Sequence, residues 1–103
     1  MLRRWGVKQG EQFEESADKC GLPRERLQLH LEAVTLSLER DALMYSHPFE
    51  GESRRVITTT DYMGDGCLLT FYVVLYKDIT AQIKWVERTS LPEGNDNGAE
   101  ATS

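Results

Sequence analysis

The chain has 103 residues, of which 40% are hydrophobic and 28% are charged, and its formal net charge is −5. This length suits one domain with a small core of its own, and the composition is that of an ordinary globular protein. No stretch reaches the roughly 18 apolar residues that a membrane span requires. The charged start at Met1–Trp5 is not followed by the apolar core of a secretory signal. We therefore expect a cytoplasmic protein.

The negative charge is concentrated at the C-terminal end. Four acids and one base lie between residues 87 and 103, which gives this end a charge of −3 and leaves −2 for the other 86 residues. Residues 89–103 are rich in Gly, Asn, Asp and Ser without periodicity, which predicts a disordered acidic tail after a single α+β domain at 1–88. Broad nucleic-acid binding is disfavoured, because it requires clustered Lys and Arg.

The first of two predicted helices spans residues 9–20. Its apolar residues recur at helical spacing on one face, and these are Phe13, Ala17 and Cys20. Gly21 and Pro23 follow, a pair that is typical of one helix ending and the next beginning. Cys20 and the other cysteine, Cys67, both fall at apolar positions, so we expect two buried, reduced thiols.

The second helix is predicted over residues 23–44 and carries apolar residues along two opposite sides. The first row consists of Leu27, Leu31, Val34, Leu38 and Ala42. The second row consists of Leu29, Ala33, Leu36 and Leu43. A helix with two apolar rows contacts something on each side. We expect the sheet on one side, and either the preceding helix or a partner protein on the other.

Three strands are predicted after a loop at Tyr45–Gly51, which contains a proline and a glycine. Arg54–Thr60 is rich in β-branched residues. Cys67–Tyr76 is apolar on both faces, as is typical of a central strand. Ile79–Val86 alternates between apolar and polar residues. The residues that we expect on its apolar face are Ile79, Ala81, Ile83 and Trp85.

The links between these strands are short, which favours antiparallel neighbours. A turn is predicted at residues 61–66 and a tight link at 77–78, whereas residues 1–7 are left open between a strand and a loop. The predicted fold class is therefore α+β, with a helical hairpin packed on one face of a three- to four-stranded antiparallel sheet.

Polar residues near the predicted strands are the candidates for chemistry. His47 lies in the predicted loop, and an imidazole can transfer protons near neutral pH. Arg54 and Arg55 open a strand and Lys84 lies on the polar face of the last one, where such cations can hold a phosphate. Adjacent strand residues point to opposite faces, so only one of the two arginines can serve a shared site. No metal-ligand spacing or phosphate-binding loop is present, so neither a metal nor a cofactor is expected.

Several sequence segments, taken in their order along the chain, resemble a known family of proteins. These segments are Leu22–Leu27 at the start of the long helix, His47–Gly51, Arg54–Val56, Phe71–Tyr76 and Ile83–Val86. In this pattern, over about residues 5–88, the chain resembles the RelE/ParE superfamily of bacterial toxins. The resemblance implies a helical hairpin on an antiparallel sheet and a component of a toxin–antitoxin module.

The resemblance also implies two modes of action. RelE-like members are ribosome-dependent mRNA endonucleases, ParE-like members inhibit DNA gyrase, and an antitoxin segment wrapped over the helices and sheet neutralises both. RelE-like nucleases carry basic residues and a terminal His or Tyr near the last strand. Here Val86 is followed by an acidic tail without either residue, and the charge favours a ParE-like binder or a degenerate member. If the chain is an endonuclease, we expect the catalytic residues His47, Arg54, Arg55 and Lys84.

Two other interpretations of the sequence stay open. A non-enzymatic inhibitor of the kind phages use would occupy the basic surface of a partner with the acids of its helices. A homodimer without catalysis would be joined through the second apolar row of the helix at 23–44. We expect Tyr72, Tyr76 and Trp85 to pack on the sheet, with stacking on RNA bases as the alternative.

Overall fold

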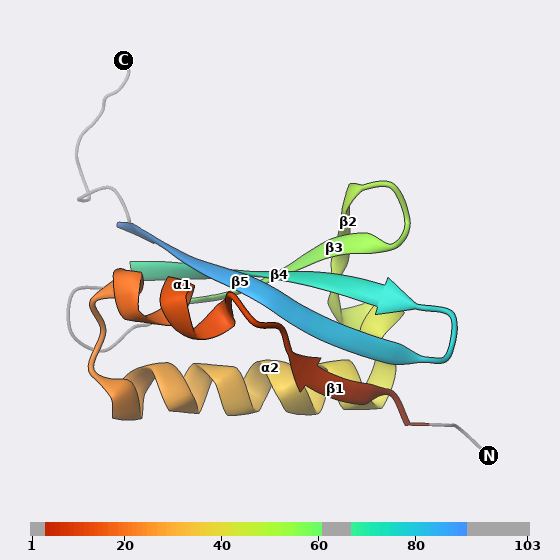
Figure 1. Ribbon diagram of the computed structural model, residues 1–103, viewed down its shortest axis with the longest axis horizontal. Helices are drawn as coiled ribbons and strands as arrows, with labels where there is room; N and C mark the ends of the chain where they lie inside the picture. The colour runs from red at the N-terminus through yellow and green to blue at the C-terminus, as the bar shows by residue number, and fades with distance from the viewer. Residues whose placement is uncertain (1–3, 61–66, 91–103) are drawn as a thin grey trace.

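A computed structural model describes residues 4–60 and 67–90 and shows an α+β fold (Figure 1). Its elements are β1 (Gly6–Gln9), α1 (Phe13–Cys20), α2 (Arg24–Tyr45), β2 (His47–Glu50), β3 (Arg54–Thr60), β4 (Cys67–Tyr76) and β5 (Thr80–Ser90). In these two ranges no helix is long and apolar enough to cross a membrane. The predicted turn at residues 61–66 and residues 91–103 of the predicted tail lie outside the described residues. The assignment of Thr89 and Ser90 to the tail was wrong, because they end β5 and pair with Leu68 and Cys67 of β4.

The sheet has five strands in the order β1-β5-β4-β3-β2. The predicted meander is confirmed, because β3, β4 and β5 pair as antiparallel neighbours. The prediction of three or four antiparallel strands was nevertheless wrong, since β1 pairs in parallel with β5, from Gly6 opposite Thr80 to Gln9 opposite Ile83. A parallel neighbour requires a long connection, and here the two helices and strands β2 to β4 all lie between β1 and β5 in the chain.

The predicted loop at Tyr45–Gly51 contains strand β2. His47 pairs with Val56 and Pro48 pairs with Arg55 of β3, and the register shifts between Pro48 and Glu50. Proline lacks the N–H that a central strand needs, and it is therefore a sound signal against such a strand. At the edge of a sheet the missing N–H costs little, because only one side of the strand has a neighbour.

The core lies between the two helices and one face of the sheet (Figure 1). The first row of α2 is buried as predicted, and none of its residues is more than 7% exposed. Phe13 of α1 adds a ring that stacks on Phe71 of β4 with 6.4 Å between the ring centroids. Cys20 and Cys67 are both buried and free, which confirms the prediction made for the thiols.

Helix α1 is fastened to β5. The Ser16 hydroxyl donates to the carbonyl of Phe13 at 2.7 Å and accepts from the N–H of Val86 at 3.0 Å. The Cys20 thiol donates to the carbonyl of Val86 at 3.8 Å. These side chains satisfy backbone groups of β5 beyond the short stretch that β1 pairs with, so this part of the strand has a helix as its neighbour.

A β-bulge interrupts the regular alternation of β5. Tyr72 of β4 pairs with Trp85, whereas Val73 pairs with Ile83, so Lys84 is the extra residue. Because of this insertion Val86 enters the core, while Trp85 lies opposite Tyr72 and is only half-buried. The prediction that Trp85 shares a face with Ile83 was wrong, since two residues of a bulged strand oppose one on its partner.

The second apolar row of α2 faces away from the sheet and is exposed. The exposed fractions are 66% for Leu29, 58% for Leu36 and 52% for Leu43. The row is extended at the end of the helix by Met44, which is also exposed. The expectation that the preceding helix covers this row was wrong, because α1 packs against β5. Of the two expected occupants only a partner protein remains open.

Candidate functional site

The face of the sheet opposite the helices carries an open hollow of about 430 Å³. Side chains from β2, β3, β4 and β5 line it, and they include Phe49, Glu50, Arg54, Tyr72, Tyr76 and Lys84. We call this feature the outer hollow. On β4 the aromatic lining residues Tyr72 and Tyr76 alternate with buried positions, so the sheet itself fixes the direction of these side chains.

Three aromatic rings form the apolar part of the outer hollow. Phe49 meets Tyr72 edge-on, with 5.4 Å between the ring centroids and 74° between the planes. Tyr76 lies further along β4, where its hydroxyl donates to Gln82 at 2.9 Å and Lys8 stands 6.0 Å from the centre of its ring. Phe49 and Tyr76 are exposed, so their faces are available to a bound group.

Two cations border the same hollow. Arg54 forms an ion pair with Glu50 at 3.1 Å and is otherwise exposed. Lys84, the bulge residue, is exposed and has no ion pair within residues 4–60 and 67–90. A β-bulge commonly redirects a side chain, and here it brings an ammonium group to a sheet face that also carries aromatic rings. The hollow can therefore hold an anionic or planar group with modest electrostatic strength.

The Tyr72 hydroxyl donates a 2.9 Å hydrogen bond to a carboxylate oxygen of Glu87. The hydrogen bond raises the pKa of Tyr72 above its ordinary value, and burial and the charge of Glu87 act in the same direction. The phenol is thus held in its neutral form, since only that form can donate to the carboxylate. Tyr72 is consequently a hydrogen-bond donor and a packing surface, and it is a poor proton acceptor.

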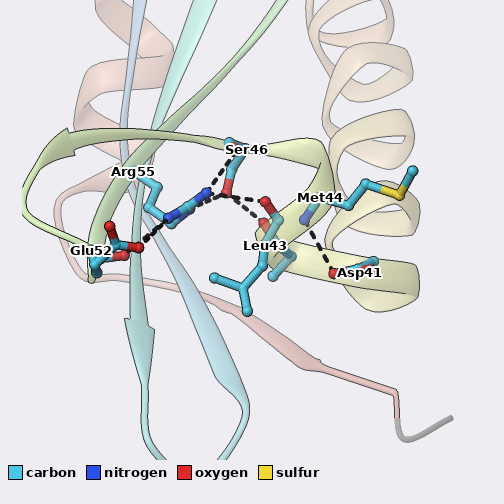
Figure 2. A network of polar contacts seen from close by, with 7 residues as sticks. Asp41, Leu43, Met44, Ser46, Glu52 and Arg55 are labelled. Atoms are coloured by element: carbon cyan, nitrogen blue, oxygen red, sulfur yellow. Dashed lines mark hydrogen bonds and ion pairs between the residues drawn. The ribbon is translucent and has the colours of Figure 1, made fainter.

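Arg55 points to the other side of β3 and joins the strand to the end of α2 (Figure 2). Its guanidinium donates to the Ser46 hydroxyl at 2.7 Å, to the Ser46 carbonyl at 2.9 Å and to the Leu43 carbonyl at 3.0 Å. A further donor reaches the carbonyl of Glu52 at 3.2 Å. Arg55 is only 5% exposed, so its donors are occupied by the protein. We call this set of contacts the Arg55 clamp.

The Arg55 clamp provides the hydrogen-bond donors that cap the C-terminus of α2. The last turn of α2 contains no basic residue, and Ser46 after it has extended backbone angles. The helix also leaves regular geometry at Asp41, whose carboxylate accepts from the N–H of Met44 at 3.1 Å. Carbonyl groups at a helix C-terminus lack partners and carry partial negative charge, so a buried guanidinium there satisfies both needs.

Three of the four predicted site residues, Arg54, Arg55 and Lys84, line the outer hollow. Only Arg54 and Lys84 offer an exposed cation there, because the clamp directs the Arg55 guanidinium to the end of α2 on the opposite face. The expectation that only one of the two arginines can serve a shared site agrees with this arrangement. His47 is an exposed residue of edge strand β2, not of a loop, and it does not line the hollow.

Sequence reasoning missed two features of this region. Phe49 was not singled out, because the prediction of a loop hid its place beside Tyr72. The structural role of Arg55 was missed as well, and no local signal could have indicated it. Its partners come from the end of a helix that is brought to β3 only by the tertiary fold. Interpretation of His47–Glu50 as an edge strand would have placed Phe49 on the sheet.

No group of three or more His, Cys, Asp or Glu residues that could hold a metal ion is found in the part of the chain that the structure describes. Comparison of the sequence with protein-family models, with curated proteins and with solved structures gives no match. Any assignment of function therefore depends on the fold, the outer hollow and the exposed row of α2.

Proposed function

We propose that this chain is a RelE/ParE-like, toxin-type protein of a toxin–antitoxin module that acts by binding a macromolecular target. The observation that carries the proposal is the exposed second row of α2. Leu29, Leu36 and Leu43 stand more than half exposed along one helix, with Met44 at its end. These leucines are seven residues apart and therefore lie on one side of the helix, with Ala33 between the first two. A row of exposed apolar side chains on one helix face is typical of a helix that binds a protein partner.

The architecture supports the same proposal. The resemblance implies a helical hairpin on an antiparallel sheet. In this chain two helices precede four consecutive antiparallel strands, β2 to β5, and β1 adds a parallel strand at the edge. Both helices pack on one face of the sheet, and the outer hollow lies on the other. An antitoxin segment bound along α2 would bury the exposed row. To contact the outer hollow as well, it would have to pass around the edge of the sheet.

Binding explains the site better than cleavage. RNA cleavage needs a group that takes a proton, and cations that stabilise the phosphate in the transition state. His47 does not line the outer hollow, the Arg55 guanidinium is occupied, and the raised pKa of Tyr72 keeps its phenol protonated. Arg54 and Lys84 remain for contact with a target. We therefore favour a gyrase-type inhibitor over a ribosome-dependent endonuclease.

One observation favours the endonuclease as a second candidate. Arg54, Lys84 and three aromatic rings share the outer hollow, and cations beside exposed rings suit a single-stranded RNA segment. In that case the substitution Arg54→Ala would abolish the effect on cells and leave the fold intact.

Controlled expression in a bacterial host tests the proposed function. We expect growth to stop, with incorporation of labelled thymidine falling before incorporation of labelled methionine. The opposite order, together with newly cleaved messenger RNA, would assign the chain to the endonuclease type. Normal growth at a protein level confirmed by immunoblot would contradict both versions of the proposal, and a non-toxic inhibitor or homodimer would then be the better interpretation.

A further inference from the structure

A groove of about 420 Å³ runs between β1 and α2. Its lining includes Gln9 from β1 and Leu31, Glu32, Thr35, Leu36 and Glu39 from α2. We call it the β1 groove. Leu36 belongs both to this groove and to the exposed row of α2, so one partner segment can contact the two surfaces without a break.

The wall formed by β1 offers unpaired backbone groups. The N–H of Gly6 donates to the carbonyl of Ile79, the residue before β5, and the N–H of Gly10 donates to the carbonyl of Ile83 in β5, each at 2.9 Å. In a parallel pair alternate residues direct their backbone groups to opposite sides of the strand. Val7 and Gln9 therefore direct their N–H and C=O groups away from β5. Their side of β1 has no neighbouring strand in the described ranges, 4–60 and 67–90.

The orientation of this free edge follows from the preceding residue. Trp5 lies two residues before Val7, so its backbone groups point to the same side of the strand as those of Val7 and Gln9. The N–H of Trp5 donates to the carbonyl of Glu39 in α2 at 3.1 Å. The free edge of β1 thus faces α2 and the β1 groove. An extended segment in the groove would have backbone partners on one side and the flank of a helix on the other.

The charged side chains that line the β1 groove indicate which charge a bound segment should carry. Glu32 and Glu39 are the charged residues in its lining, and both are acids. Glu32 accepts a long 3.5 Å hydrogen bond from the uncharged Gln28. The C-terminal residues 91–103 carry three acids and no base, so like charge disfavours this part of the same chain as an occupant.

We propose that the β1 groove binds an extended, basic and apolar segment of a partner protein, which adds to the sheet as a strand beside β1. Its backbone pairs with Val7 and Gln9. Its apolar side chains contact Leu31 and Leu36, and its Lys or Arg side chains pair with Glu32 and Glu39. The inference rests on the proposed function for the identity of the partner, the antitoxin, and it names the chemistry by which that partner is recognised.

A fluorescein-labelled peptide of alternating lysine and valine tests this site against the full chain. We expect saturable binding by fluorescence anisotropy, and slower hydrogen exchange of the Val7 and Gln9 amides when the peptide is bound. The double variant with Glu32→Gln and Glu39→Gln should bind about fivefold more weakly, as expected for two solvent-accessible ion pairs. The matched control with Glu11→Gln and Glu15→Gln removes the same charge elsewhere and should bind as the unmodified chain does.

Three results would overturn the inference. They are no binding of the peptide, equal weakening by the two double variants, and binding without protection of Val7 and Gln9. Protection of these amides in the chain alone, together with twice the expected mass by light scattering, would assign the groove to a second copy instead. Growth arrest is measured independently. Growth arrest without peptide binding would refute only the binding site proposed for the β1 groove. Peptide binding without growth arrest would refute only the toxin assignment.

Discussion

The two apolar rows of α2 have similar residues and opposite surroundings. Leu38 in the first row is fully buried, while Leu36 in the second row is 58% exposed. The sheet covers only one side of the helix, and α1 is held at β5 by Ser16 and Cys20 instead of covering the other. The comparison teaches that hydrophobic periodicity identifies both rows, whereas the tertiary fold decides which row forms the core and which stays exposed.

The largest expected effect comes from the same truncation in the two rows. Leu38→Ala should lower the free energy of unfolding by about 2–5 kcal/mol, because it opens a cavity in the core. Leu36→Ala should change it by no more than about 0.5 kcal/mol, as expected for an exposed position. Urea unfolding followed by circular dichroism measures both. Similar losses for the two variants would show that the second row is covered within the chain.

The two adjacent arginines give the next comparison. Arg55→Ala should cost about 1–3 kcal/mol of unfolding free energy, because the Ser46 carbonyl would lose its donor in a buried place and the Leu43 carbonyl would lose its donor in a partly buried one. Arg54→Ala removes an exposed ion pair with Glu50 and should cost less than about 0.5 kcal/mol. Equal stabilities of the two variants in urea would contradict the Arg55 clamp.

A smaller effect is expected where α1 meets β5. Ser16→Ala removes the acceptor for the N–H of Val86 and should lower the unfolding free energy by about 1 kcal/mol. Ser37→Ala in α2 is the matched control and should be within about 0.5 kcal/mol of the unmodified chain. If Ser16→Ala unfolds at the same urea concentration as the control, Ser16 does not fasten α1 to the sheet.

The smallest expected effect concerns the outer hollow. Glu87→Gln should lower the pKa of Tyr72 toward its ordinary value, since the carboxylate is the main cause of the increase. Phenolate absorbance during an alkaline titration reports it. A raised folded pKa means that the stabilisation from Tyr72 is complete below the unfolded value near 10 and is lost as the pH rises through the folded value. An unchanged titration in Glu87→Gln would refute the contact between the two side chains.

The sequence was sufficient for elements with a clear period. The buried row of α2, the strands at Arg54–Thr60 and Cys67–Tyr76 and the burial of both cysteines were all predicted, because 3.6-residue and two-residue periods report directly on which side is covered. The helix at Phe13–Cys20 starts four residues later than predicted, at its first buried aromatic residue.

Features that depend on distant partners were not predicted. The parallel pairing of β1 and the edge strand β2 leave little local trace in stretches of four residues each. The bulge at Lys84 is invisible in an alternating pattern and moved Trp85 to the other face. Of the predicted site, Arg54 and Lys84 offer exposed cations at one hollow. The Arg55 guanidinium instead binds carbonyls at the end of α2, which only the tertiary fold brings close to β3.

The most direct test of the central claim compares relief of growth arrest for two forms of the chain. The unmodified chain and the double variant with Leu29→Glu and Leu36→Glu are each co-expressed with the product of the neighbouring gene, which the proposed function assigns as the antitoxin. Both positions are exposed, so the variant should fold and still stop growth. We predict that co-expression restores growth only for the unmodified chain, because two carboxylates in the apolar row exclude the partner. Equal restoration of growth for both forms would contradict the assignment of this row as the partner-binding surface.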